Sequence, residues 1–319
     1  GYHIREAGST AAQELAFTLN NGFVYIEECL DRGLKIDEFA HRLSFFFNSH
    51  IDFFEEIAKY RAARRIWANT LKNKYNAKNE NSLKLKFHTQ TAGCSLTAQQ
   101  PENNIVRTAY EAMAAVLGGT NSLHTNALDE TLALPSEKAA KIALRTQQVL
   151  AYETGIASVA DPLGGSWYIE DMTDRIEQEA MEYFKIIESL GGTINAIEEG
   201  YFQKEIADSA SVYQESIDTN DRIIVGINDF VEKDEKLDID ILEISEEAQK
   251  IQEKKVKDLR KSRDSKSLNE EMEKLRNACK DNVNLVPYLI SVAEKGGTVG
   301  EIVDIMKSVY GEWQESFGF

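Results

Sequence analysis

The sequence predicts an α/β protein that contains about half of a (β/α)8 TIM barrel, followed by a mostly helical extension. Over the first 160 residues, a strand-like run and then a helical run repeat at intervals of roughly forty residues, about the length of one βα unit with a generous loop. After Asp161-Pro162 the strand-like runs give way to helical ones. We therefore divide the chain into a barrel half, residues 1–160, and a helical extension, residues 161–319.

The first βα unit is predicted from the opening residues. Tyr2-His3 would end its strand. A helix follows, and Thr10 and Gln13 have the spacing of a capping box at its start. The apolar positions of this helix include Leu15, Leu19 and Val24.

The second and third units repeat this order. Residues 43–50 predict a strand that is followed by a helix through Trp67. Residues 82–91 predict the third strand, and its helix runs from Pro101 to Gly118-Gly119, where the glycines favour a helix end.

The fourth unit has a strand at residues 121–126 and a helix with Ser136 as its N-cap. Four βα units are half of an eightfold barrel, and a parallel sheet of this kind normally has both faces covered. An open antiparallel sheet with one face in water is the alternative. The long helix after each strand favours the parallel arrangement, because antiparallel strands are usually joined by short turns.

Polar residues occupy alternate positions of these strands, where an ordinary barrel interior carries branched aliphatic side chains. Burying so many polar groups without partners would cost about 1–3 kcal/mol each. We therefore expect a polar tunnel that a polar molecule fills. The alternating positions are Arg42, Ser44 and Asn48 (interrupted by Phe46), then Lys84, Lys86, His88 and Gln90, then Ser122, His124 and Asn126.

The first part of the extension, residues 161–230, predicts helices at 173–190 and 194–206 and a short strand at 222–228. The final residues, 283–310, predict two helices joined at Gly296-Gly297.

Residues 232–280, between these parts, are dense in charge but carry two apolar stripes. Stripes of this spacing predict amphipathic helices that dock on another surface. The two stripes are Ile244, Ala248, Ile251, Val256 and Leu259, and Leu268, Met272, Leu275 and Cys279.

Composition excludes several classes of protein. The net charge of −17 disfavours a nucleic-acid or anionic-membrane role, because both need a cationic surface. No apolar run is long enough to cross a bilayer. Three widely spaced cysteines indicate a reducing compartment, and we predict the cytoplasm. The chain opens with Gly1 and has no leader pattern, so we expect it to be the interior of a longer reading frame.

Residue chemistry alone identifies few candidates. No Ser-His-Asp order, phosphate-binding loop or metal-ligand motif is present, so we predict no metal ligand. Three of the five histidines, His3, His88 and His124, fall on or at the ends of predicted strands. A single strand histidine is usually structural. His3 is the strongest candidate because it follows Tyr2 at a strand end and precedes the turn at Gly8.

Several segments carry a resemblance to a known family. They are GYHIREAGST (1–10), DEFAHRLSFFF (37–47), HTQTAG (88–93), NNIVRTAYEAMAAVLGGT (103–120), SLHTNALDETLALP (122–135) and ADPLGGSWYIE (160–170). Together they resemble the large catalytic subunit of methylmalonyl-CoA mutase, over nearly the whole chain. The resemblance implies the second half of a substrate-binding barrel and then the helical segment that leads toward a cobalamin-binding domain.

The resemblance also implies roles for individual residues. His3 matches the histidine that hydrogen-bonds the substrate thioester, and Tyr2 would shield the reacting centre. Arg42 and Ser44 match positions that contact coenzyme A; the alternative for Arg42 is a surface ion pair. Lys84 and Lys86 lie at the same end of the neighbouring strand and would assist there.

A second set of residues matches the layer that faces the corrin ring of the cofactor. Gly93, Glu130 and Ala133 match this layer, and Gln90 would belong to it as well. A glycine at position 93 permits the close approach of a flat ring. The alternative for Glu130 is an ordinary acid of a loop.

The implied activity is that of an isomerase dependent on adenosylcobalamin, which interconverts methylmalonyl-CoA and succinyl-CoA by a radical 1,2-rearrangement. A related mutase acting on isobutyryl-, ethylmalonyl- or 2-hydroxyisobutyryl-CoA is the first alternative. A non-catalytic partner subunit of such a mutase is the second. In either catalytic case the resemblance implies a vitamin B12 enzyme.

Some residues of this chain differ from the pattern of the family that it resembles. Cys94 and Leu163 stand where the family has tryptophan, and Glu102 stands where it has tyrosine, which affects the packing around the cofactor layer. The cobalt-ligating DxHxxG motif and the first half of the barrel are missing from these residues. We therefore expect the fragment to be inactive alone. Its expected partners are the N-terminal barrel half, a cobalamin-binding domain or subunit, the acyl-CoA substrate and, in a dimer, a further chain, but no nucleic acid and no membrane.

Overall fold

A computed structural model describes the chain except for residues 235–238, 240, 244 and 315–319. The chain forms two compact units, one of residues Gly1–Leu242 and a second that begins at Glu243. Ile244 of the predicted apolar stripe lies outside the described residues. Among the described residues, no helix has both the length and the apolar composition needed to cross a membrane.

Within the described part of the first unit, three parallel strands form a sheet in the order β1 (Phe45–Ser49), β2 (Phe87–Thr91) and β3 (Ser122–His124). The parallel pairing confirms the α/β class and rules out the antiparallel alternative. The sheet is consistent with a partial barrel, and its closure into a TIM barrel stays a prediction.

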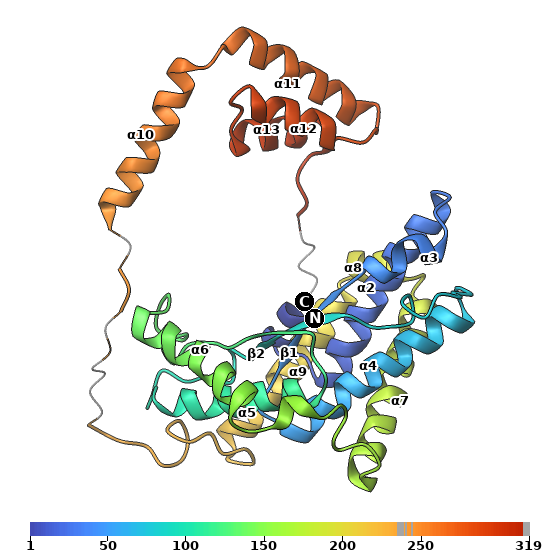
Figure 1. Cartoon of the computed structure of the whole chain (residues 1–319), viewed down its shortest axis with the longest axis vertical. Helices are drawn as coiled ribbons and strands as arrows, with labels where there is room; N and C mark the ends of the chain where they lie inside the picture. Colours follow the sequence, from blue (N-terminus) through green and yellow to red (C-terminus); the bar gives the residue numbers. More distant parts are fainter. Residues whose placement is uncertain (235–238, 240, 244, 315–319) are drawn as a thin grey trace. The chain divides into compact units, whose positions relative to one another are not determined.

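Helices cover one face of this sheet (Figure 1). Phe47 and Phe87 point to this side, where both rings pack against Tyr60 of α4 (Phe53–Asn73), at centroid distances of 6.2 and 5.1 Å. Helix α5 (Asn103–Leu117) packs on β1 and β2, and α6 (Glu137–Tyr152) packs on α5. The predicted N-cap is confirmed, because the Ser136 hydroxyl accepts a hydrogen bond from the N–H of Ala139.

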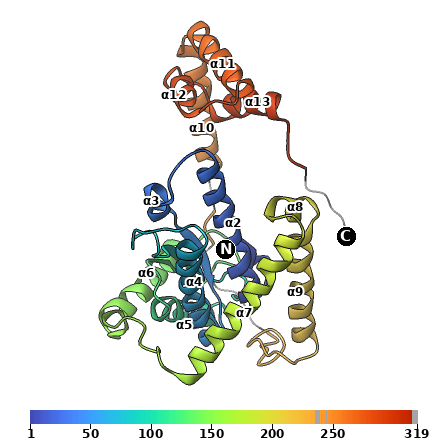
Figure 2. The same ribbon diagram turned by 90° about the vertical axis from the view of Figure 1, so that its right-hand side faces the viewer.

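Two long helices, α2 (Ala11–Asp31) and α7 (Trp167–Ser189), pack beside α4 (Figure 2). Helix α2 starts with the predicted capping box of Thr10 and Gln13. Helix α7 follows the short 3-10 turn η2 (Ile156–Ser158) and packs against both α2 and α4. Arg61 of α4 joins α7 through an ion pair with Glu170.

A short helix, α1 (Tyr2–Glu6), lies against β1 on the face opposite α4. The prediction of a strand ending at Tyr2-His3 was therefore wrong. The N–H of Arg5 donates to the carbonyl of Gly1 in a helical turn, and the Tyr2 ring stacks on Phe46 of β1 at 4.9 Å. This tertiary packing selects a helix over an extended chain.

Two further strand predictions need correction. Residues 82–86 are not part of the third strand, because backbone bonds from Ser82 to Asn79 and from Leu83 to Glu80 fold this stretch into turns. The predicted strand at 222–228 forms only an isolated bridge between Val225 and Asp229. Asn228 holds that loop closed by donating to the carbonyls of Ile217 and Arg222.

The helix predicted at 194–206 is two helices, α8 (Thr193–Glu198) and α9 (Tyr201–Asp218). Gly200 separates them with a φ of 73°, which is outside the helical range. Helix α8 packs on α2, α7 and α9, so these helices belong to the first unit. The compact units therefore divide at residue 242, whereas the functional division proposed at residue 160 stays a prediction.

The second unit is helical. Its helices are α10 (Glu246–Ser262), α11 (Ser265–Lys280), α12 (Val286–Glu294) and α13 (Val299–Tyr310). The last two are the predicted pair, joined at Gly296-Gly297. Helices α11 to α13 share a core of Leu268, Leu275, Cys279, Val292 and Ile305.

Candidate functional site

Three of the predicted site residues, Tyr2, His3 and Gln90, lie on the face of the sheet opposite α4, which we call the open face. Side chains alternate along a strand, so the register fixes which residues share this face. One row across the sheet is Phe46, His88 and Ser122, and the next is Asn48, Gln90 and His124. Apart from Phe46, every member is polar, which agrees with the predicted polar side of the strands.

Gln90 and Asn126 turn toward α1 on this face. The Gln90 side-chain N–H donates to the Tyr2 hydroxyl and to Oδ1 of Asn126, both at 2.8 Å. Asn126 in turn donates to the carbonyl of Thr91 at 3.0 Å. The structure thereby brings together predicted residues from α1, β2 and the segment after β3. Burial, with Glu6 nearby, raises the pKa of Tyr2, so its hydroxyl stays protonated.

Glu6 is a candidate site residue that the sequence did not indicate. Its carboxylate accepts from Nδ2 of Asn48 at 2.6 Å and from the backbone N–H groups of Gly93 and Cys94, both at 2.9 Å. Burial raises the pKa of Glu6 despite these hydrogen bonds. Glu6 thus ties α1 to β1 and to the loop after β2. Its position one helical turn from Tyr2 and His3 is the only sequence signal that could have indicated it.

Gly93 lies in close contact with this cluster. A Cβ at this position would be 3.0 Å from Oε2 of Glu6, 3.3 Å from Nδ2 of Asn126 and 3.6 Å from the Tyr2 hydroxyl. A larger residue would therefore displace the groups that hold α1 in place. The neighbouring thiol of Cys94 has its pKa raised to about 12 by desolvation and by Glu6, so it is not a nucleophile at neutral pH.

A buried group of charges lies behind the cluster. Lys59 Nζ is 2.5 Å from both Glu14 and Glu56, and all three side chains are fully buried. Lys59 also donates to the carbonyl of Asn48, and Glu14 accepts from the N–H of Asn48 at 2.7 Å. Burial opposes ionisation of Glu56, but Lys59 and Arg5 lower its pKa. This network fixes the backbone of Asn48, whose side chain holds Glu6.

His3 is exposed at the edge of the cluster. Its ring lies 5.7 Å from Tyr2 and 6.5 Å from Phe46, in edge-on arrangements. An exposed imidazole beside two aromatic rings can donate a hydrogen bond to a bound molecule. His88 and His124 are farther along the open face, and burial lowers the pKa of each.

Arg42 and Ser44 lie at the other end of β1. Helix α3 (Ile36–Phe39) and the 3-10 turn η1 (Ala40–Arg42) lead into this strand and leave both side chains exposed. No ion pair of Arg42 is found within the described part of the chain, so the alternative of a surface pair gains no support. Ser44 borders a pocket of about 190 Å³. The pocket is lined by Gly1, Thr18, Asn21, Gly22, Tyr25, Leu43, Ser44, Phe45 and Phe46.

The two lysines predicted near Arg42 lie in the turn segment before β2. Lys84 donates to Asn81 at 3.0 Å, and Lys86 donates to the carbonyl of His41 at 2.7 Å. Because His41 precedes Arg42, Lys86 is at the same end of the sheet as Arg42.

Glu130 and Ala133 belong to the loop after β3. The Ala133 N–H donates to the carbonyl of Asp129, in a turn that precedes α6. Burial, Glu6 and Asp129 raise the pKa of Glu130, so the loop lies within electrostatic reach of the α1 cluster. The loop and Gly93 thus border the carboxyl end of the sheet together. Of the other departures, Glu102 is the N-cap residue of α5, and Leu163 lies in the turn before α7.

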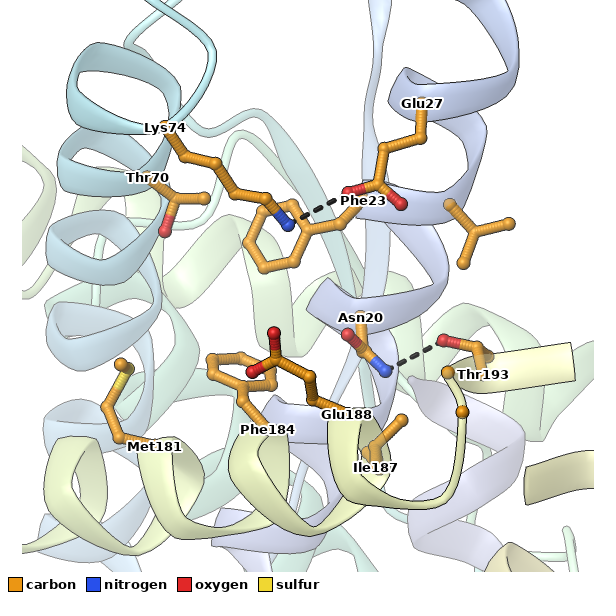
Figure 3. Close-up of a pocket in the computed structure, with 13 residues that line it drawn as sticks. Asn20, Phe23, Glu27, Thr70, Lys74, Met181, Phe184, Ile187, Glu188 and Thr193 are labelled. Atoms are coloured by element: carbon orange, nitrogen blue, oxygen red, sulfur yellow. Dashed lines mark hydrogen bonds and ion pairs between the residues drawn. The ribbon is translucent and has the colours of Figure 1, made fainter. Parts of the chain in front are cut away.

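A separate hollow of about 440 Å³ lies between helices α2, α4 and α7 (Figure 3). Phe23 and Phe184 form its apolar wall, and the ion pair of Lys74 with Glu27 borders it. None of the predicted site residues lines this hollow. It is therefore distinct from the site on the open face.

The described residues include no group of three or more His, Cys, Asp or Glu side chains placed to hold a metal ion. The open face offers hydrogen-bonding groups, among them the side chains of Tyr2, Gln90 and Asn126. Such an arrangement can bind and orient a polar molecule and polarise a carbonyl group.

Comparison with known proteins completes these observations. A family model described as methylmalonyl-CoA mutase matches residues 1–312. The chain is 44% identical over 317 residues to the 2-hydroxyisobutanoyl-CoA mutase large subunit of Aquincola tertiaricarbonis, covering 99% of this chain and 56% of that protein. It is 42% identical over 315 residues to methylmalonyl-CoA mutase of Rhizobium meliloti (strain 1021), covering 98% and 44%. It is 43% identical over 314 residues to the mitochondrial methylmalonyl-CoA mutase of Homo sapiens, covering 98% and 42%. The chain thus spans about half the length of these relatives.

Proposed function

The chain belongs to the methylmalonyl-CoA mutase family, and we propose that it forms part of the active site of an adenosylcobalamin-dependent isomerase that rearranges an acyl-CoA. The observation that carries the proposal is the cluster of Tyr2, Glu6, Gln90, Gly93 and Asn126, which joins α1 to the carboxyl end of the sheet. Ligands of parallel α/β sheets bind at this end.

The proposed substrate is methylmalonyl-CoA, which would be interconverted with succinyl-CoA. A second candidate is 2-hydroxyisobutyryl-CoA, because the relative with that named activity is 44% identical to this chain. Isobutyryl- and ethylmalonyl-CoA are further members of the same substrate class.

Residues at the two ends of the sheet would contact different parts of the substrate. Arg42 and Ser44 are exposed at the amino end of β1 and would contact the coenzyme A portion. The thioester would lie along the open face, so that His3 donates to its carbonyl and Tyr2 screens the reacting carbon from water. A donor at this point stabilises charge on a carbonyl group as the group migrates.

The proposed cofactor is adenosylcobalamin. The residues present fit it in one respect: Gly93 is partly exposed at the carboxyl end of the sheet, and its lack of a side chain would let a flat ring approach the backbone from the exposed side. Gln90, Glu130 and Ala133 would border that ring. Adenosylcobalamin, when bound, would supply the radical that starts the rearrangement. The cobalt ligand would come from a cobalamin-binding domain or subunit, and the N-terminal barrel half would complete the tunnel.

The protein would assemble with other chains. The name of one relative, a large subunit, supports a separate partner subunit. We propose a dimer and a cytoplasmic location, although relatives from animals are named as mitochondrial.

Turnover by the full-length protein tests the proposal. With adenosylcobalamin and any partner subunit present, we expect conversion of methylmalonyl-CoA or 2-hydroxyisobutyryl-CoA, and the faster reaction identifies the substrate. His3→Ala should lower turnover by about 10²–10³-fold while binding of the coenzyme A portion stays nearly unchanged. His3→Gln, which keeps a donor, should recover part of the loss. Binding of both esters without any reaction would support the non-catalytic alternative.

A further inference from the structure

Helix α10 has an apolar stripe that is largely unpartnered among the described residues of its own unit. We define the α10 stripe as Ala248, Ile251, Val256 and Leu259. Of the α10 residues that the structure describes, none is buried, and the side chains of Ile251 and Leu259 are 48% and 41% exposed. Helix α10 meets the rest of the unit at its C-terminal end, where Leu259 and Arg263 border Gly296 and Arg260 pairs with Glu301. The stripe therefore has an apolar surface still to be covered.

The spacing within the α10 stripe is the same when read in either direction. The steps between its members are three, five and three residues, and Gln252 and Lys255 stand symmetrically between them. When two copies of such a helix lie antiparallel, Ala248 of one copy is level with Leu259 of the other, and Ile251 is level with Val256. An isologous contact between identical chains requires this kind of self-complementary surface.

The charges along α10 are also self-complementary. Residues 246–253 carry three acidic side chains and one basic side chain, whereas residues 254–262 carry five basic and one acidic. Antiparallel copies place the acidic half of each helix beside the basic half of the other, and a parallel pair would place like beside like. The helix dipoles are opposed in the antiparallel pair as well, which adds to its stability.

We propose that α10 pairs antiparallel with the α10 helix of a second copy of this chain, about a two-fold axis between Glu253 and Lys254. The occupant of the stripe is thus the same stripe of another copy. This inference does not depend on the proposed activity, because it uses only the pattern and exposure of α10.

Distances between single spin labels test the pairing, because one label per chain reports only on contacts between chains. Labels are placed on cysteines introduced at Glu246, Glu253 or Lys261 in full-length protein whose native cysteines are replaced; these positions point away from the stripe. In the antiparallel pair, the two labels at Glu253 are nearly level, whereas those at Glu246 or at Lys261 are offset by about 23 Å along the helices. We expect the shortest distance at Glu253 and longer, equal distances at the other two.

A variant of the stripe provides the second part of the test. Ile251→Gln with Val256→Gln keeps good helix formers but removes apolar contacts, and it should abolish the distances measured at Glu253. The matched control Lys254→Gln changes a residue of the same helix outside the stripe and should preserve them. Equal distances at all three positions would show a parallel pair and contradict the proposal. An absence of short distances, or distances that survive the double substitution, would show that the stripe docks elsewhere.

Discussion

The two faces of the three-stranded sheet differ in what they bury. On the face covered by α4 and α5, Phe47 and Phe87 are 0% and 2% exposed and pack against an aromatic ring. On the open face, the neighbouring residues His88 and Gln90 are partly accessible and use hydrogen bonds instead. Alternate residues of the same strands therefore pack in a closed apolar core on one side and make polar contacts on the other, where we propose that the substrate binds. The predictions below test that separation, from the largest expected effect to the smallest.

Adjacent phenylalanines of β1 offer the most direct comparison of the faces. Phe47→Ala should lower the free energy of unfolding by about 3–5 kcal/mol, because it leaves a cavity in a closed core. Phe46→Ala removes a half-buried ring on the open face and should cost less stability, while it frees Tyr2 and impairs turnover. Urea denaturation of the two variants measures the difference. Equal losses of stability would show that the faces are not distinct in this respect.

The charge network behind the open face gives the second prediction. Lys59→Met should lower the free energy of unfolding by about 3–5 kcal/mol, because Glu14 and Glu56 then remain buried without their cation. Lys72→Met, an exposed position of the same helix, is the matched control and should change stability little. If both variants unfold at the same urea concentration, the network does not hold β1 in place.

Gln90 is expected to matter more for activity than for stability. Gln90→Leu keeps the volume but removes the hydrogen bonds to Tyr2 and Asn126, with an expected cost of about 1–2 kcal/mol in the free energy of unfolding. Turnover should fall because Tyr2 loses its anchor. Gln99→Leu, at an exposed position of the following loop, controls for the added apolar surface. Full turnover by the Gln90→Leu protein would show that the hydrogen bond from Gln90 to Tyr2 is not needed for activity.

Glu6 should give stability a distinctive pH dependence. Burial raises its pKa, so between the ordinary carboxyl range and that raised pKa the folded chain holds a proton that the unfolded chain has lost. Its contribution is therefore complete below the ordinary carboxyl range and is lost as pH rises through the raised pKa. In urea denaturation at several pH values, the free energy of unfolding of wild type should rise relative to that of Glu6→Gln as the pH falls.

A second carboxylate provides a control with the opposite sign. Burial of Glu27 is outweighed by hydrogen bonds from Lys74 and Tyr75, which lower its pKa. Wild type should therefore lose stability relative to Glu27→Gln as the pH falls through that lowered pKa. The same sign for Glu6 and Glu27 would mean that burial does not set the pKa of Glu6.

Local signals in the sequence predicted most of the secondary structure. The caps at Thr10 and Ser136 and the alternation around Gln90 depend on nearby residues, and the structure confirms them. The error at Tyr2-His3 has a different origin, since the ring of Tyr2 is placed by Phe46, more than forty residues away in sequence.

The charged residues around the candidate site that the sequence did not indicate also depend on partners distant in sequence. Glu6, Glu14 and Lys59 are charged residues of helices, and such residues usually lie at the surface. Only the assembled contacts show that Glu14 and Lys59 are buried, that Glu6 is partly buried, and that all three are linked through Asn48. Conversely, the lysines at 84 and 86 alternate as a strand would, but turns upstream of β2 contain them.

The location of a bound acyl-CoA tests the central claim most directly. The measurement is a crystal structure of the full-length protein with its thioester substrate or an unreactive analogue. The account predicts that the thioester lies on the open face, with its carbonyl within hydrogen-bond distance of His3 and its chain passing Phe46 and His88. A ligand found in the hollow between α2, α4 and α7, with the open face covered by protein side chains, would contradict it.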